Sequence, residues 1–346
     1  MNKQSGKEPD TVRTLAYHEA RAEAVAQILK SDERVFVFGG DLSMPFNPPN
    51  TLNQDFPDRF MVPPIAELGV AGFAIGAAMA GQRPIVDFYT ASFMFEAWPQ
   101  VVNEAANVAY MSNGRVSVPV VFRILTGIRG QGAAQHSAIP QAMLWNTPGL
   151  KVVLPSSPYD VKGLLKTAVD DGNPVVFVDH LLLAEVRAPV PEELYGIPFG
   201  QADIKRRGSD LTIVATSLMV QKALIAAEAL ARDGVSAEVL DLRTLCPLDE
   251  ETLLQSVSKT GRVVVADECH LRCGVGSELA ATIAEKAWGA LKAPPRRVAT
   301  LDVPIPFSPP LERFVEPTAE KIVAAARELL EPTLTKAQAP VRNRQA

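Results

Sequence analysis

The chain has 346 residues, of which 47% are hydrophobic and 21% charged, and its formal net charge at pH 7 is -5. This composition is typical of a globular protein, and the length favours two domains over one. The acidic balance argues against a general nucleic-acid-binding protein, which would carry a basic surface, and no apolar run reaches the ~20 residues of a membrane-spanning helix.

Short runs rich in β-branched residues alternate with helical patterns through the first half of the chain. The predicted strands are 35–38, 84–88, 118–122, 151–154 and 174–178. The predicted helices are 16–29, a segment that begins at Glu67, 95–111 and 159–169. Because the strands are apolar throughout and alternate with helices, they predict a parallel sheet that is covered on both faces.

A change of pattern follows at residues 183–207, which contain three prolines and show no periodicity, so we expect a linker there. Beyond it the alternation resumes, with predicted strands at 211–215, 236–240, 262–266 and 297–301 and predicted helices at 219–232, 250–258, 274–288 and 318–330. We therefore predict an α/β protein with two doubly wound domains, residues 14–182 and 208–331, followed by a polar tail at 332–346.

The cysteines indicate a reducing compartment. Three cysteines are too few for a disulfide framework in a chain of this length. Cys269 and Cys273, with His270 between them, lack the second pair of ligands that a zinc site needs. The first residues show neither the apolar segment of a secretory signal nor the arginine-rich pattern of a transit peptide, so we expect a cytoplasmic protein.

Glu67 is the single charged residue of the segment 62–81, VPPIAELGVAGFAIGAAMAG. One interpretation is structural, because the helix dipole favours an acid in the first turn by about 0.3–1 kcal/mol. The other is functional, because a carboxyl group at the edge of a buried segment can exchange a proton with a ligand. The small residues that follow would let another helix, such as one of a second subunit, approach closely.

Two further stretches are candidate binding segments. Residues 125–137, LTGIRGQGAAQHS, contain three glycines before His136 and predict a flexible binding loop, although the phosphate-binding pattern with Gly-Lys-Ser/Thr is missing. A lone histidine is also common as a capping or surface residue. Phe93, which follows the predicted strand 84–88, could line a pocket or belong to the core.

The turn at 168–174 also has two interpretations. Gly172 followed by Pro174 is typical of a helix C-terminus. The alternative is a monovalent-cation site built from carbonyl and carboxylate oxygens, which are the ligands that hard cations prefer.

Motifs spread along the chain match one family. They are GGD (39–41), PIAE (64–67), GAAMAG (76–81), QVVN (100–103), AQHS (134–137), PGLKVV (148–153), DLRTL (241–245) and DVPIP (302–306). In them, and over nearly its whole length, the chain resembles the β subunits of the decarboxylating first component of 2-oxo acid dehydrogenase complexes, which are transketolase-like thiamine diphosphate enzymes. The resemblance implies an N-terminal pyrimidine-binding domain and a C-terminal transketolase-like domain.

The same resemblance implies roles for four residues. Glu67 would hydrogen-bond the aminopyrimidine ring of thiamine diphosphate and promote the imino form, which removes the thiazolium proton. Phe93 would pack on that ring, and Glu96 would line the cofactor channel. His136 would assist substrate binding or acyl transfer to lipoamide. A structural potassium site is implied at Val120, Ala168, Val169, Asp171 and Asn173.

A missing motif implies a partner. Enzymes of this kind hold Mg2+ and the diphosphate through a Gly-Asp-Gly motif, which this sequence lacks. A separate α subunit that carries the motif would therefore supply those contacts in an α2β2 tetramer, and the β subunit alone should be inactive. Gly40 and Pro99 stand where relatives carry acids of a proton-relay channel between the active sites, and the loop 42–58 is shorter and rich in proline. These departures bear on communication between the sites and on the substrate.

The implied function is oxidative decarboxylation of a 2-oxo acid, either pyruvate or a branched-chain acid, with acyl transfer to lipoamide on a lipoyl acyltransferase core. One alternative is the β subunit of an acetoin dehydrogenase, or of a thiamine-dependent ketolase or carboligase that uses no lipoyl group. Another is a non-catalytic scaffold subunit.

Overall fold

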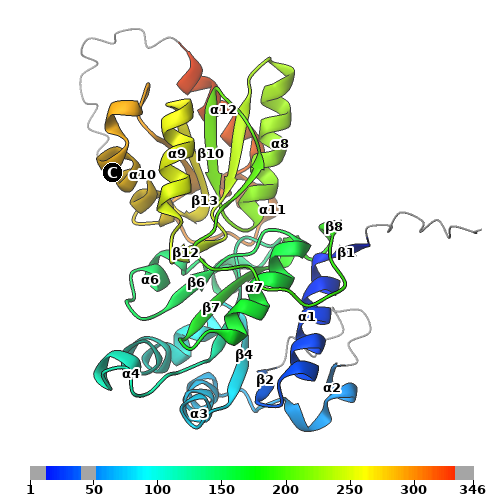
Figure 1. Cartoon of the computed structure of the whole chain (residues 1–346). Helices are drawn as coiled ribbons and strands as arrows, with labels where there is room; N and C mark the ends of the chain where they lie inside the picture. The colour runs from blue at the N-terminus through cyan, green and yellow to red at the C-terminus, as the bar shows by residue number, and fades with distance from the viewer. Residues whose placement is uncertain (1–12, 40–51, 332–346) are drawn as a thin grey trace, which may run out of the picture.

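The structure is a computed structural model that describes residues 13–39 and 52–331. The chain forms two α/β lobes, one above the other in Figure 1, and each lobe is built around its own sheet. The described part therefore has the α/β architecture of two doubly wound lobes that the alternating pattern predicts.

The first lobe is built around a sheet with the strand order β12-β6-β7-β5-β4-β2-β3. The strands are β2 (Val35–Gly39), β3 (Phe60–Met61), β4 (Arg83–Thr90), β5 (Val121–Thr126), β6 (Lys151–Val153), β7 (Val175–His180) and β12 (Thr244–Cys246). All neighbours are parallel except β12, which runs antiparallel to β6. The central strands β5 and β7 are buried throughout, which explains their lack of alternating polar residues.

Helices cover this sheet on both faces. They are α1 (Tyr17–Ser31), α2 (Leu52–Asp55), α3 (Glu67–Met79), α4 (Ala106–Met111), α5 (Ala133–His136), α6 (Gln141–Trp145) and α7 (Pro158–Asp170). The apolar faces of α1 and α7 pack together, and α3 lies at the far end of the lobe from the second sheet (Figure 1).

The helix predicted at 95–111 is divided into three segments. Residues Phe93–Ala97 form the 3-10 segment η3, Pro99–Ala105 form the π-helical segment η4, and α4 follows at Ala106. Pro99 explains the division, because it has no backbone N–H to continue an α-helical ladder and its ring opposes the preceding turn.

The second lobe contains a sheet with the strand order β14-β13-β10-β11-β9. Its strands are β9 (Asp203–Arg206), β10 (Leu211–Ala215), β11 (Ala237–Asp241), β13 (Val263–His270) and β14 (Arg296–Thr300). Its helices are α8 (Leu218–Arg232), α9 (Glu250–Thr260), α10 (Val275–Lys286), α11 (Pro309–Val315) and α12 (Ala319–Leu330). Only β9 is antiparallel to its neighbour.

The segment 183–207, which the sequence predicts as a linker, contains two strands, and each lobe receives a strand from outside its own stretch of chain. Within residues 183–207, β8 (Arg187–Pro189) pairs with β1 (Thr14–Ala16), and β9 extends the second sheet. In the opposite direction, β12 comes from the second half of the chain and extends the first sheet. These backbone bonds and the shared apolar cluster beneath them join the lobes.

A buried cluster of ion pairs lies in the first sheet. Arg123 on β5 contacts Asp87 at 2.9 Å and Asp179 at 2.8 Å, and Arg21 on α1 contacts Asp179 at 2.5 Å. Burial opposes ionisation of Asp179, but the two guanidinium groups hold the pKa of Asp179 well below its ordinary value. The cluster therefore fixes β4, β5, β7 and α1 to one another.

Three negative findings concern the described residues. None of their helices has the length and apolar character to cross a membrane. No group of three or more His, Cys, Asp or Glu side chains is arranged to hold a metal ion in residues 13–39 and 52–331. All three cysteines are free thiols, as the sequence indicates.

Candidate active site

Glu67 is the first residue of α3. Pro63 and Pro64 precede the helix in an extended segment, and Ala66 at the N-cap position supplies no side-chain cap. The Glu67 side chain is half-buried, and no hydrogen bond or ion pair holds its carboxylate within the residues that the structure describes. The helix dipole stabilises the charge there, and the carboxylate oxygens remain available to a group from outside the chain.

A row of rings lies on the neighbouring segment. The Phe93 ring in η3 stacks on Tyr89 with a centroid distance of 6.3 Å and meets the His136 ring edge-on at 5.8 Å. The Arg129 guanidinium lies 5.4 Å from the centroid of the Tyr89 ring. The structure thus brings Phe93 and His136 together although 43 positions separate them in the chain.

The loop between β5 and α5 presents His136. Gly127 and Gly130 have positive φ angles of 89° and 83°, and Gln131 and Ala133 also adopt the left-handed region. An added Cβ at Gly127 would lie 2.1 Å from Nε2 of His180, so this position needs glycine for space as well as for conformation. The Ser92 hydroxyl donates to the Gln135 carbonyl, and that of Thr90 to the His136 carbonyl at 3.4 Å.

Glu67, Glu96 and His136 lie at the surface of the first lobe. Glu96 and His136 are exposed, Phe93 is half-buried, and α3 packs directly against η3 and η4. No contact joins Glu67 to Phe93 or His136 among the described residues. Large apolar side chains are exposed around them on α3, α4 and the approach to α3, including Ile65 (95%), Phe73 (55%) and Tyr110 (89%). Large apolar side chains that are exposed in one chain are common at surfaces that another molecule covers.

The five residues implied as potassium ligands lie around the C-terminus of α7. The Val120 carbonyl accepts a hydrogen bond from the Val175 amide at 2.9 Å. The Val169 and Asp171 carbonyls both accept from the guanidinium of Arg83, at 3.2 Å in the second case.

The carboxylate of Asp171 is also engaged, by Lys151 and by the Asn173 backbone at 2.8 Å. Burial opposes ionisation, yet these contacts lower the pKa of Asp171 on balance. Each carbonyl retains a second lone pair, so the oxygen donors suit potassium, but the ion would have to share two of them with Arg83. Potassium binding stays a prediction.

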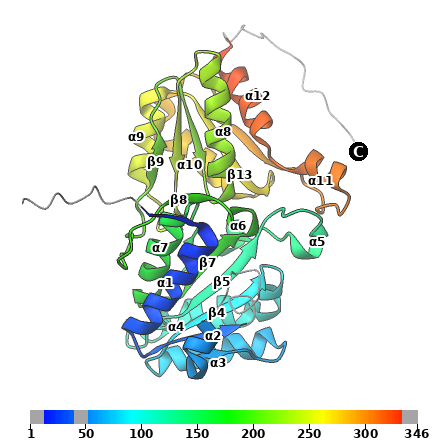
Figure 2. The ribbon, with the colours of Figure 1, turned by 90° about the vertical axis from the view of Figure 1, so that its right-hand side faces the viewer.

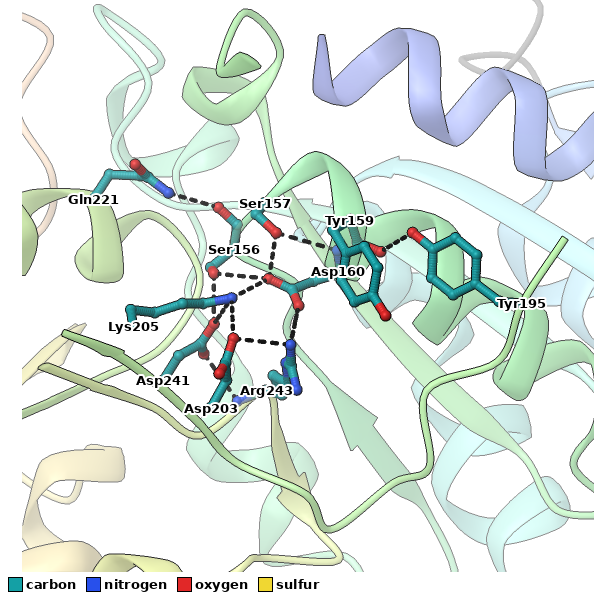
Figure 3. Close-up of polar contacts among 10 residues, drawn as sticks. All are labelled: Ser156, Ser157, Tyr159, Asp160, Tyr195, Asp203, Lys205, Gln221, Asp241 and Arg243. Atoms are coloured by element: carbon teal, nitrogen blue, oxygen red, sulfur yellow. Dashed lines mark hydrogen bonds and ion pairs between the residues drawn. The ribbon is translucent and has the colours of Figure 1, made fainter. Parts of the chain in front are cut away.

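A second polar cluster, which we call the interlobe cluster, lies between α7 and the second sheet (Figure 3). It consists of Ser156, Ser157, Asp160, Asp203, Lys205, Asp241 and Arg243. Asp160 contacts Lys205 at 2.8 Å and Arg243 at 2.7 Å, and both its side chain and that of Asp241 are fully buried. Asp203 also contacts both cations.

The interlobe cluster contains three carboxylates and two cations, and the pKa values of its two fully buried carboxyl groups shift in opposite directions. Burial and the nearby Asp160 charge raise the pKa of Asp241 to about 6, and Lys205, 3.6 Å away, offsets only part of this effect. Asp160 is equally buried, but its closer contacts with Lys205 and Arg243 lower its pKa. The Ser156 hydroxyl lies 2.5 Å from Asp241 and 3.2 Å from Asp160, so the two carboxyl groups titrate as a linked pair.

The sequence patterns assign no role to Tyr89 or Arg129, and they do not bring the residues of the interlobe cluster together. The signal for the first two was their position, Tyr89 in the last residues of β4 and Arg129 in the loop after β5, because the carboxyl ends of parallel strands meet at one edge of a sheet. The cluster combines residues up to 87 positions apart, and no local pattern marks it. A separate cleft of about 580 Å3 between α6 and α10, lined by Trp145, Cys273 and Glu278 among others, contains none of the predicted site residues.

Comparisons with known proteins extend over most of the chain. Residues 13–183 match the pyrimidine binding domain of transketolase, and residues 200–322 match the transketolase C-terminal domain. A solved structure described as a split gene transketolase, inactive β4 tetramer, superposes with a TM-score of 0.75 at 27% identity and covers 91% of this chain and 98% of that one.

Curated relatives are similar at higher identity. The β subunit of the acetoin:2,6-dichlorophenolindophenol oxidoreductase of Cupriavidus necator is 46% identical over 79% of this chain and 81% of its own length. The 2-oxoisovalerate dehydrogenase β subunit of Bacillus subtilis is 42% identical over 92% and 99%. The β subunit of the pyruvate dehydrogenase E1 component of Rickettsia felis is 41% identical over 91% and 98%.

Proposed function

The chain belongs to the family of β subunits of thiamine diphosphate-dependent 2-oxo acid dehydrogenases, and on this premise we propose that it forms, with an α subunit, an active site for the oxidative decarboxylation of a 2-oxo acid. The observation that supports the proposal most is the carboxylate of Glu67. It lies at the start of α3 without a partner inside the described chain, next to segments that carry Phe93 and His136.

The residues of this chain fit one half of the cofactor. An acid at a helix N-terminus and a half-buried aromatic ring suit a flat, nitrogen-rich pyrimidine ring, whereas the described residues offer no group of ligands for Mg2+. Thiamine diphosphate, when bound, supplies a carbanion that adds to the 2-oxo group of the substrate. The diphosphate and Mg2+ would then contact an α subunit that carries a Gly-Asp-Gly motif, which this sequence lacks.

Each proposed residue has a task that follows from its chemistry. Glu67 would hold a proton between one carboxyl oxygen and a ring nitrogen, which needs an acid in fixed position. Phe93 would offer a ring face for packing, and Glu96 would line the entrance. His136 lies exposed against the edge of Phe93, where its imidazole could donate a hydrogen bond to a substrate oxygen or assist transfer of the acyl group to lipoamide.

The exposed apolar surface around α3 supports an assembly of several subunits. A buried interface would cover side chains such as Ile65 and Tyr110, which otherwise face water. We propose an α2β2 tetramer in which a β subunit alone has no turnover, attached to a lipoyl acyltransferase core and located in the cytoplasm. Potassium at Val120, Ala168, Val169, Asp171 and Asn173 would have a structural role in it.

The test is reconstitution of the full chain with an α subunit that carries the Gly-Asp-Gly motif. The assembly, supplied with thiamine diphosphate and Mg2+, is assayed for turnover of pyruvate, a branched-chain 2-oxo acid and acetoin, in each case with lipoamide and without it. Turnover of a 2-oxo acid that requires both subunits supports the proposal. Activity restricted to acetoin would favour the second candidate, an acetoin dehydrogenase or lipoyl-independent ketolase, which the 46% identity to an acetoin-oxidising relative supports. Inactivity with all three would favour a scaffold subunit.

A further inference from the structure

The loop that carries His136 belongs to the first lobe, yet two carboxylates of the second lobe hold its backbone. Glu268 at the end of β13 accepts a hydrogen bond from the Ile128 amide at 3.2 Å. Glu312 on α11 accepts from the Gln131 amide, with distances of 3.0 and 3.1 Å to its two oxygens. Figure 2 shows α11 reaching from the second lobe to the side of α5.

Glu268 is fixed in turn by His180. The Leu182 amide donates to Nδ1 of His180 at 3.1 Å, so Nδ1 is the accepting nitrogen, and Nε2 must carry the proton that it donates to Glu268 at 3.0 Å. Burial opposes ionisation of Glu268, but His180, Lys222 and the Ile128 amide lower the pKa of Glu268 on balance. Gly127 leaves room for this contact, because an added Cβ would lie 2.2 Å from Oε2 of Glu268.

An apolar contact accompanies the two hydrogen bonds. Ile128 is buried against Ile305, which precedes α11, and Val315, the last residue of α11. Glu312 is also buried, although Leu311 and Phe314 on the same short helix are exposed. The backbone between these anchors adopts left-handed angles at Gln131 and Ala133. Residues with side chains adopt such angles at a cost in free energy, which surrounding contacts must offset.

We propose that Glu268 and Glu312 are positioning residues, which hold the loop 127–137 and thereby place His136 for the reaction. This inference rests on the proposed function for its catalytic part. It gives the second lobe a direct role in the active site, in addition to packing and assembly. Neither carboxylate touches His136, so both act through the backbone of the loop.

Three variants of the full chain test the proposal. Glu312→Ala removes the acceptor of the Gln131 amide, whereas Glu312→Gln keeps one carbonyl oxygen for it. Glu268→Gln is more disruptive. The side-chain NH2 group of the glutamine would face the N–H at Nε2 of His180, and in the other tautomer of His180 the N–H at Nδ1 would face the Leu182 amide. Glu316→Ala is the matched control, since Glu316 follows α11 and contacts Lys222 at 3.5 Å.

The first measurement is hydrogen exchange of the peptide that covers the loop 127–137. We expect exchange in this peptide to be about tenfold faster or more in Glu312→Ala and in Glu268→Gln, close to wild type in Glu312→Gln and Glu316→Ala, and unchanged in peptides from β10 and α8. If Glu268→Gln does not fold, Glu312→Ala alone decides the result. Unchanged exchange of the loop in Glu312→Ala would overturn the proposal.

The second measurement is turnover of the assembled αβ enzyme. Displacement of His136 by about 1 Å predicts a kcat that is about 10- to 100-fold lower in Glu312→Ala, with the affinity for thiamine diphosphate unchanged and most of the activity restored in Glu312→Gln. Faster exchange with wild-type kcat would contradict the positioning role. A wild-type assembly that is inactive with every substrate contradicts the proposed function instead, and the exchange result still decides whether the two carboxylates hold the loop.

Discussion

The surface around Glu67 and the interlobe cluster use the same residue types in opposite ways. Glu67 and Glu96 have no partner among the described residues, and His136 is exposed beside a ring. In the interlobe cluster, Asp160 is fully buried and contacts two cations and two serine hydroxyls. The first region is incomplete within one chain, and the second is complete.

The difference shows what a strongly shifted pKa indicates in this molecule. Shifted pKa values often mark active sites, but ion-pair networks also produce them. Here the carboxyl with a pKa raised to about 6 is Asp241, which belongs to the interlobe cluster and is not a predicted catalytic residue. A site that two polypeptides share acquires its full burial only on assembly, so the interlobe cluster shows that a shifted pKa by itself does not locate such a site.

The largest effect should come from Glu67. Glu67→Gln in the assembled enzyme removes the proton that the carboxyl group exchanges, so we expect kcat/KM to fall by about 10²- to 10⁴-fold. The free energy of unfolding of the chain should fall by at most about 1 kcal/mol, because Glu67 has no side-chain partner in the described residues and loses only its interaction with the helix dipole. Steady-state kinetics and urea titration measure the two quantities.

Glu104→Gln is the control for Glu67, because Glu104 is an exposed acid on the adjacent segment η4. It should leave both quantities unchanged. Wild-type turnover in Glu67→Gln would remove the basis for the proposed chemistry and favour a scaffold role.

Asp160→Ala should have the opposite profile, with a large effect on stability. It leaves Lys205 and Arg243 between the lobes without their main counter-charge, and loss of one partner of a buried pair costs about 3–5 kcal/mol. The exposed pair Lys286–Glu250 gives the matched control, and Lys286→Ala should cost at most about 1 kcal/mol. Urea titration of both variants makes the comparison, and equal values would mean that the interlobe cluster is no more important than a surface contact.

The interlobe cluster should also make stability depend on pH through Asp241. Its pKa is about 6 in the folded chain against an ordinary value of 3.8, so the folded chain binds this proton more tightly. The stability from Asp241 is therefore fully present below about pH 4 and is lost as the pH rises through 6, by an amount of order 1–3 kcal/mol.

Asp241→Asn cannot ionise, and it tests this pH dependence. The difference in free energy of unfolding between Asp241→Asn and wild type should shift in favour of the variant by about 1–3 kcal/mol from pH 4.5 to pH 7.5. Urea titration of both proteins at the two pH values measures it. Asp160 has a lowered pKa, and Lys205 and Arg243 stay charged in this range, so they add little to the difference. A difference that is constant with pH would rule out the titration of Asp241.

The smallest effect should come from Phe93. Phe93→Leu keeps an apolar side chain but loses ring stacking, which is worth about 0.5–1.5 kcal/mol. We expect the Kd of thiamine diphosphate for the assembled enzyme to rise about 2- to 10-fold, measured by calorimetry, with a smaller change in kcat. The control is Phe95→Leu, because Phe95 in the same segment packs edge-on against Trp98 instead. Equal Kd values for the two variants would argue against a cofactor contact at Phe93.

Much of the fold could be predicted from the sequence, since it follows from local periodicity. Apolar runs such as 211–215 coincide with β10, and the predicted helices at 219–232 and 318–330 coincide with α8 and α12 to within one residue. The break at Pro99 was also present in the sequence, but the apolar pattern of 95–111 obscured it. Motifs likewise pointed to the family and to Glu67.

Tertiary structure alone decided the contacts between distant residues. Nothing local in the sequence connects Glu312 with Gln131, Asp160 with Asp241, or β12 with the sheet of the other lobe. Hydrogen bonds and ion pairs of this kind depend on where strands and helices end in space, which the folded chain sets and a periodic pattern does not. The sequence therefore determined the alternation of strands and helices in both lobes and the acid at the start of α3. The fold decided that residues of the second lobe hold the loop that carries His136.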